Sequence, residues 1–343
     1  MTPVTQQFSD EQLKQRKHRQ NLLDDATKEL NEWTGENEAV EIHLFRMFSE
    51  VFKRHQKDEA DALFIVGTKT TTPSLAAVSS APVKPWLFSR VLALLGFSFG
   101  LLTLLFLVFH SNKAVPGMIF IGSLAVPFSL AIMFFEINVY KNISVFQATE
   151  VFLIGGIASL VATMVLYEII PSGNGTDLMS ALAIGFIEET AKMLIIGYFI
   201  NSFRLNYIFN GLLVGACVGA GFAVFETSGY TSQFGLVTLF VRSWQSIGTH
   251  TIWSAIVGAA IILAKERRKP VKGKTIVRAK FLRFYAMAIL LHAAWDWQPP
   301  FPFLNAFDLQ KWLIIILGWI VIFVLINAGL REVRTLQGQR IIN

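Results

Sequence analysis

Eight long apolar segments limit the folds open to this chain more than any other feature of its sequence. A helix needs about 20 mostly apolar residues to cross the hydrocarbon core of a bilayer. In lipid, only helices and closed barrels satisfy every backbone polar group. The sequence therefore predicts an all-α, polytopic integral membrane protein with about eight transmembrane helices. The segments cover residues 86–109, 115–135, 148–170, 178–200, 206–227, 239–264, 280–298 and 310–330.

The chain before the first apolar segment is polar and charged. Apolar residues at helical spacing between Val40 and Phe52 predict an amphipathic helix. An earlier helix is expected around Asp10–Leu30, with a turn at 33–35 between the two. We interpret this part as a small helical hairpin that packs on itself or on the membrane surface. A regulatory domain that binds a cytoplasmic partner is the alternative.

Changes in composition divide the chain into four parts. Thr, Ser, Ala and Pro dominate the stretch that precedes the first apolar segment, and this stretch has no periodicity, which predicts a linker. The predicted parts are a soluble helical N-terminal region (1–67), the linker (68–85), an eight-helix membrane domain (86–332) and a tail (333–343).

Lysine and arginine residues are distributed unequally among the loops. Nine of them lie between Lys265 and Arg283, whereas the loop at 171–176 has none. Because loops rich in Lys and Arg face the cytoplasm, eight helices predict that both termini are cytoplasmic. This distribution also accounts for the net charge of +6. The expected partner is therefore the lipid bilayer, and we do not expect this protein to bind nucleic acid.

Three charged residues, Glu188, Glu189 and Lys192, lie near the middle of the apolar segment 178–200. A charge at that depth costs at least about 2.5–3.5 kcal/mol on insertion scales. A membrane protein that keeps three of them there is expected to use them.

Further ionisable residues occur in the next three segments. They are Glu226, Arg242, His250, His292 and Asp296. Counting about 1.5 Å per helical residue along antiparallel segments places all of them, with Glu188, in the half of the membrane opposite the basic loop. The sequence therefore predicts that these residues form one site.

Adjacent carboxylates in a low-dielectric environment are candidates for a general base or acid. Lys192 lies four residues after Glu188 and three after Glu189, so it can pair with either. A purely structural ion pair between Lys192 and Glu188 is the alternative. His292 and Asp296 are four residues apart on one helical face, so the carboxylate is expected to orient the imidazole.

Two forms of hydrolytic site fit these residues. In the metal-free form, Glu188 or Glu189 takes a proton from water, His250 and His292 stabilise the oxyanion or leaving amine, and Glu226 positions the water or a histidine. In the other form, zinc is bound by His250, His292 and Glu226. The sequence favours the metal-free form, because no local zinc motif is present, and it leaves zinc open as a cofactor.

Four motifs in this order resemble the PrsW family of intramembrane proteases, which is related to CAAX prenyl endopeptidases and CPBP-type membrane proteins. They are Glu188-Glu189-x-x-Lys192, Phe222-x-x-x-Glu226, His250 within Thr-His-Thr-Ile-Trp-Ser-Ala, and His292-Ala-Ala-Trp-Asp296. The resemblance covers about residues 178–300. It implies catalytic roles for Glu188, Glu189, Glu226, His250 and His292, with Lys192, Asp296 and Phe222 in support.

The resemblance also implies an activity and a location. The expected reaction is hydrolysis of a peptide bond in a single-pass membrane protein, such as an anti-sigma factor, on its outward side. The expected location is the cytoplasmic (inner) membrane of a bacterium.

Two functions of other classes remain open from the sequence. Intramembrane Glu, Lys and His also mark proton relays, so a transporter or proton-coupled carrier is one alternative. A non-catalytic membrane scaffold is the other. Against a transporter, the polar residues stop in one half of the membrane, and the sequence has no inverted repeat of interrupted helices.

Overall fold

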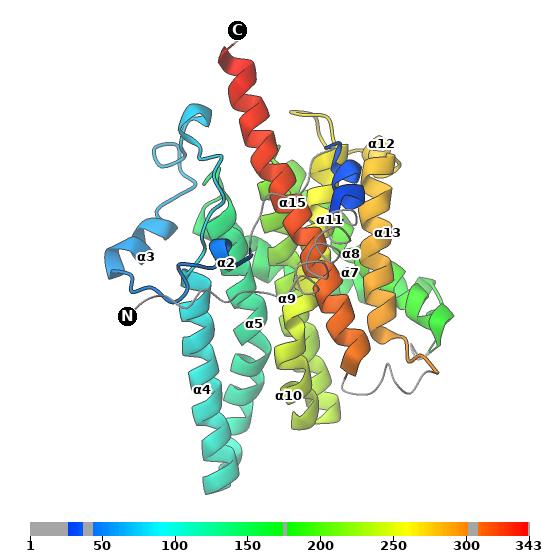
Figure 1. Ribbon diagram of the computed structural model, residues 1–343. Helices are drawn as coiled ribbons and strands as arrows, with labels where there is room; N and C mark the ends of the chain where they lie inside the picture. The colour runs from blue at the N-terminus through cyan, green and yellow to red at the C-terminus, as the bar shows by residue number, and fades with distance from the viewer. Residues whose placement is uncertain (1–26, 37–43, 174–176, 301–307, 342–343) are drawn as a thin grey trace, which may run out of the picture.

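The computed structural model describes residues 27–36, 44–173, 177–300 and 308–341, and every regular element within these ranges is helical (Figure 1). The predicted all-α fold is therefore confirmed. The long helices are α4 (Leu87–Phe109), α5 (Val115–Ile137), α7 (Gly156–Ile169), α8 (Leu178–Ser202), α9 (Ile208–Phe234), α10 (Leu236–Gln245), α11 (His250–Ala264), α13 (Ala279–Asp296) and α15 (Leu309–Ile341). Shorter elements are a helix at 27–34, α2 (Leu44–Met47), α3 (Lys57–Phe64), α6 (Val145–Glu150), a π-helical turn (Val151–Gly155) and α12 (Gly273–Ile276).

Six helical stretches of the described chain are long and apolar enough to cross a membrane. They are Leu87–Phe109, Asn112–Ile137, Val145–Ile169, Ile208–Phe234, Leu236–Ala264 and Leu309–Gly338. The other two predicted segments are also helical, α8 with 25 residues and α13 with 18. Both are less apolar because they carry charged side chains, α8 near its middle and α13 near both ends. The described chain is thus a polytopic membrane protein, and both α8 and α13 contribute to the site below.

The segment predicted as one helix over 239–264 is interrupted. α10 gives way to a 3₁₀ turn over Ser246–Gly248, and α11 begins at His250. Gly248 packs so closely on α15 that a Cβ atom added to it would lie 2.4 Å from the Ile315 side chain. The break makes His250 the first residue of a helix, where the sequence had placed it in the middle of one.

The central helix of the bundle is α9, which packs along α11 (Figure 1). Gly211, Gly215 and Gly219 face α11, and a Cβ atom added to any of them would lie 2.1–2.3 Å from a backbone oxygen of α11. Small residues allow this close approach, which favours helix association in lipid. These glycines therefore allow α9 and α11 to pack tightly, and the contact at Gly219 lies against the backbone of His250.

Substituting Gly215 with alanine is expected to lower the melting temperature of the purified protein in detergent. The added methyl group would overlap the Ser254 carbonyl, and overpacking of this kind costs about 1–3 kcal/mol. Gly197 on α8 is a matched control, because nothing lies within 4 Å of its Cβ position. Gly197→Ala should leave the melting temperature unchanged or raise it, and equal melting temperatures for the two variants would contradict the packing argument.

The described N-terminal residues pack on the end of the bundle that carries the basic residues 265–283, called here the basic end. The Trp33 ring meets the edge of Phe284 of α13 at 5.6 Å between centroids. His55 stacks on Trp86 at 3.8 Å, and Met47 is buried in the main hydrophobic core. These contacts attach the N-terminal region to the membrane helices.

The helices predicted in this region are only partly seen. Most of the helix expected around Asp10–Leu30 lies outside the described residues, and the helical residues 27–34 end at Gly35, which has a positive φ of 97°. The prediction of an amphipathic helix between Val40 and Phe52 is wrong in its length. Among the described residues of this stretch, only the single turn of α2 is helical. Phe45 and Phe52 are 97% and 95% exposed, so the apolar pattern there does not build a buried helical face.

The predicted linker and tail contact each other. Gln337 of α15 donates hydrogen bonds from its side chain to the carbonyls of Leu75 and Val78. The tail predicted from residue 333 continues α15 as a helix to Ile341.

Candidate active site

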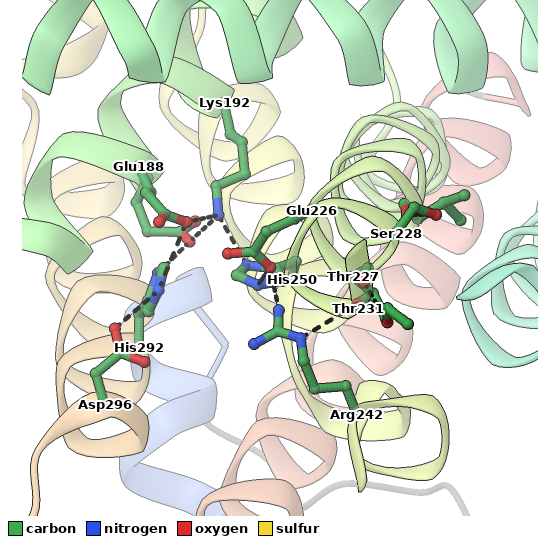
Figure 2. Close-up of polar contacts among 12 residues, drawn as sticks. Glu188, Lys192, Glu226, Thr227, Ser228, Thr231, Arg242, His250, His292 and Asp296 are labelled. Atoms are coloured by element: carbon green, nitrogen blue, oxygen red, sulfur yellow. Dashed lines mark hydrogen bonds and ion pairs between the residues drawn. The ribbon is translucent and has the colours of Figure 1, made fainter. Parts of the chain in front are cut away.

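Four helices bring the predicted site residues to one level of the bundle. At about 1.5 Å per residue from the basic end, His250 and His292 lie about 20 Å along α11 and α13, and Glu188 lies about 21 Å along α8. Glu226 of α9 lies about 27 Å from the same end. Figure 2 shows these side chains facing one another, with Lys192 among them.

Lys192 lies at the centre of the cluster and is fully buried. Its Nζ lies 2.7 Å from Glu189 Oε1 and 3.5 Å from Glu188 Oε2, and it donates a hydrogen bond to His250 Nδ1 at 3.0 Å. The ammonium also lies over the ring of Phe222, 4.3 Å from its centroid. The ion pair that the sequence allowed with either glutamate is thus made with both.

His292 contacts both glutamates of α8. Its Nδ1 lies 2.9 Å from Glu189 Oε1, and its Nε2 lies 3.6 Å from Glu188 Oε2 and 3.4 Å from Asp296 Oδ2. The approach of α8 to α13 is close here, because a Cβ atom on Gly185 would lie 3.0 Å from the Ile289 carbonyl.

His250 joins the cluster to α9 and α10. Its Nε2 lies 2.9 Å from Glu226 Oε2. The same carboxylate oxygen pairs with the guanidinium of Arg242, whose Nε donates to Thr227 Oγ1 at 3.3 Å (Figure 2). Arg242 thereby holds Glu226 against the imidazole.

These contacts show which nitrogen of each imidazole pairs with Glu226 or Glu189, and what the other nitrogen faces. An ammonium can only donate, so His250 Nδ1 accepts from Lys192 and the proton lies on Nε2, toward Glu226. His292 has the reverse arrangement, in which Nδ1 lies against Glu189 and Nε2 faces Glu188 and Asp296. Metal-binding histidines share this pattern, in which one nitrogen donates to a carboxylate and the other is the ligand.

A metal-ligand set emerges from the same geometry. Glu188, His250 and His292 each offer one ligand atom, and the three atoms lie within 4.8 Å of one another. Two histidines and a carboxylate form a ligand set known from catalytic zinc sites. Glu188 stands in this set where the sequence suggested Glu226, because His250 Nδ1 and His292 Nε2 face Lys192 and Glu188 of α8, whereas Glu226 pairs with the other nitrogen of His250.

The charges of the cluster also suit a cation. Four carboxylates face two cations, which leaves two negative charges when both imidazoles are neutral. The carboxylates are Glu188, Glu189, Glu226 and Asp296, and the cations are Lys192 and Arg242. In addition, Glu189 Oε2 is buried and has no hydrogen-bond partner among the described residues. A divalent ion would balance the charge, so the residues fit a metal.

The cluster opens away from the basic end. The side chains of Glu189 and Lys192 are 0% exposed, whereas those of Asp296 and Arg242 are 29% and 28% exposed. A small pocket beside His250 leads to this side, and its lining includes Arg242 and Gln245. The cluster is therefore more exposed on the α10 side than at Glu189 and Lys192.

Two residues of the cluster were not assigned roles from the sequence. Tyr167 of α7 donates a hydrogen bond to Glu188 Oε1 at 3.0 Å, and Arg242 holds Glu226. Arg242 is visible in the sequence as a charge within an apolar segment, but its partner is not. Tyr167 gives no signal in the sequence, because tyrosine is common near the ends of membrane helices.

Comparison with known proteins agrees with the resemblance seen in the sequence. A model of the PrsW family of intramembrane metalloproteases matches residues 144–326. The chain is 25% identical over 204 residues to Protease PrsW of Halalkalibacterium halodurans, covering 57% of this chain and 92% of that protein. It is 30% identical over 127 residues to Protease PrsW of Bacillus subtilis, covering 36% of this chain and 55% of that protein. No solved structure matches the chain significantly.

The family match spans more than half of the chain and contains the whole cluster of glutamates and histidines. The predicted family is therefore confirmed. As a multi-pass membrane protein with this match, the chain belongs to the PrsW family of intramembrane metalloproteases.

Proposed function

We propose that this chain hydrolyses a peptide bond in a single-pass membrane protein, such as an anti-sigma factor, with zinc held by Glu188, His250 and His292. The observation that carries the proposal is the pairing of His250 with Glu226 and of His292 with Glu189, which leaves the other nitrogen of each ring on the side of Lys192 and Glu188. The family description as metalloproteases supports the metal. A bound zinc ion would polarise the scissile carbonyl and make water a better nucleophile at neutral pH.

The other carboxylates of the cluster position the ligands and move the proton. Glu226 orients His250, and Glu189 orients His292 through Oε1. With Glu188 as a ligand, Glu189 is the residue left to accept the proton of the attacking water, because its Oε2 has no partner among the described residues. Lys192 and Arg242 offset part of the negative charge.

The pocket beside His250 offers hydrogen-bond donors to the substrate. Gln245 is buried, and its Nε2 has no partner among the described residues, while the Arg242 guanidinium lies in the same pocket wall. Donors placed before the reaction begins stabilise the oxyanion that develops on the scissile carbonyl. We assign this role to Gln245, with Arg242 beside it.

The direct test is cleavage of a single-pass substrate by the purified full-length protein in liposomes. Cleavage should stop in the presence of a chelator and return when zinc is added. If the protein still cleaves once metal analysis has verified that it holds no metal, the zinc-dependent form is rejected. Water activated by glutamate alone would then be favoured.

The site is expected to work from the outward half of the membrane, with both termini cytoplasmic. An impermeant maleimide should label Ser172→Cys in intact cells, and should label Lys272→Cys only after permeabilisation. The background is low, because the single native cysteine, Cys217, is buried. Labelling of both positions from the same side would contradict this topology.

A further inference from the structure

A second cavity lies at the basic end, far from the glutamate and histidine cluster. Its volume is ≈ 230 Å³, and it lies between the end of α8, the α8–α9 connection and the chain that follows α11. Its charged lining residues are Arg204, Lys265, Arg268 and Lys269, and no acidic side chain among the described residues lines it. We call this cavity the basic pocket.

Two asparagines give the basic pocket fixed walls. Asn206 Oδ1 accepts hydrogen bonds from Lys265 Nζ at 2.7 Å and from the Arg268 backbone N–H at 2.8 Å. Asn201 pairs with the backbone of Val271 through both its oxygen and its nitrogen. The two connections are therefore tied together, and the cavity between them is part of the fold.

The positive charge in the basic pocket is mostly unbalanced. Lys269 pairs with Glu266, but the guanidinium groups of Arg204 and Arg268 have no acidic partner among the described residues. Burial lowers the pKa of the Lys265 ammonium, so a ligand that brings negative charge would stabilise its charged form. Arginine and lysine converging on one cavity suit a phosphate group.

An apolar surface leads from the membrane to the basic pocket. On α8, Leu194 and Tyr198 are 54% and 64% exposed, and nothing lies within 4 Å of the Cβ position of Gly197. These residues share one face of α8 and precede the pocket residue Asn201 by one to two turns. A molecule with a phosphate head and apolar chains would contact both surfaces at once.

We propose that the basic pocket binds the phosphate group of an anionic phospholipid, whose acyl chains lie along the Leu194–Tyr198 face of α8. Basic cavities between membrane helices bind phospholipid headgroups in this way. The shared chemistry is a phosphate group, which a soluble phosphate ion would also present. The proposal is independent of the protease reaction, because no residue of the catalytic cluster lines the basic pocket.

The test uses native mass spectrometry of the full-length protein in detergent, titrated separately with phosphatidylglycerol, phosphatidylcholine and inorganic phosphate. The wild type should retain phosphatidylglycerol in preference to phosphatidylcholine. The double variant Arg204→Asn/Arg268→Asn should bind phosphatidylglycerol more weakly by about tenfold or more, since each basic residue contributes to lipid binding. Both arginines have a positive φ, 55° and 62°, which asparagine tolerates, so the variant is expected to fold.

The matched control is Lys274→Gln/Arg283→Gln, which removes two exposed positive charges from the same end outside the basic pocket. It should retain phosphatidylglycerol as the wild type does. Equal weakening in both double variants, or weakening in neither, would overturn the proposal. A third outcome is that the wild type binds inorganic phosphate but not phosphatidylglycerol, and that only the Arg204→Asn/Arg268→Asn variant loses phosphate. This outcome would overturn the proposed lipid ligand and identify the basic pocket as a site for soluble phosphate.

Discussion

Replacing Glu188 with glutamine is expected to slow cleavage of a single-pass substrate by about 10²-fold or more, because it removes the charged ligand of the proposed zinc site, and loss of a group that only orients a ligand already costs about 10–100-fold. Glutamine keeps the size of the side chain and its hydrogen bond with Tyr167, but it removes the charge that faces His292 and Lys192. Initial rates of cleavage in liposomes measure the effect. Glu189→Gln should be comparably harmful, because it removes the proposed proton acceptor and the partner of His292 Nδ1.

The matched control for this loss is Glu168→Gln on α7, because Glu168 is exposed and lies outside the cluster. It should cleave at the wild-type rate. Lys192→Met should be milder than either change at Glu188 or Glu189, because Lys192 is assigned only the balancing of charge. Wild-type rates in both glutamine variants, with folding verified, would end the assignment of catalysis to this pair.

Removing either histidine of the cluster is expected to abolish stoichiometric zinc binding. Loss of a group that only orients a ligand costs about 10–100-fold in metal affinity, and loss of a ligand should cost more. Zinc content of His250→Ala and His292→Ala, measured on purified protein by mass spectrometry, should fall far below one ion per chain. The cleavage rates of both histidine variants should fall together with their zinc content.

Two further variants sharpen the zinc experiment. His110→Ala is the matched control, because His110 is exposed at the end of α4 and outside the cluster. Lys192→Met should bind zinc more tightly than the wild type, since the ammonium contacts two of the three proposed ligands. A wild-type protein that binds no zinc would reject this ligand assignment and leave the glutamates as the proposed catalytic groups.

The helices and their polar positions are predictable because they depend on local sequence. Long apolar segments predict membrane helices, and all eight predicted segments are helical. The level of the site along the bundle also follows, because the rise per residue is constant in a helix. Glu188, His250 and His292 can therefore be placed at one depth by counting along the chain.

Contacts across the bundle cannot be obtained by this counting. Glu189 and His292 are 103 positions apart, and Glu226 and Arg242 lie on different helices. Their distances depend on helix rotation and on the close approach of backbones at glycines such as Gly185 and Gly219. The interruption before His250 likewise depends on packing against α15, which no local pattern reveals.

By itself, then, the sequence determined the all-α membrane fold, the family and the residue types of the site, because hydrophobicity and motif order are properties of the chain alone. Only the tertiary structure decided that Glu188, and not Glu226, groups with His250 and His292 as a candidate metal-ligand set. It also decided that Arg242 and Tyr167 join the cluster. The physical reason is that ligand geometry depends on distances of a few ångströms between helices, which are set by side-chain packing across the whole bundle.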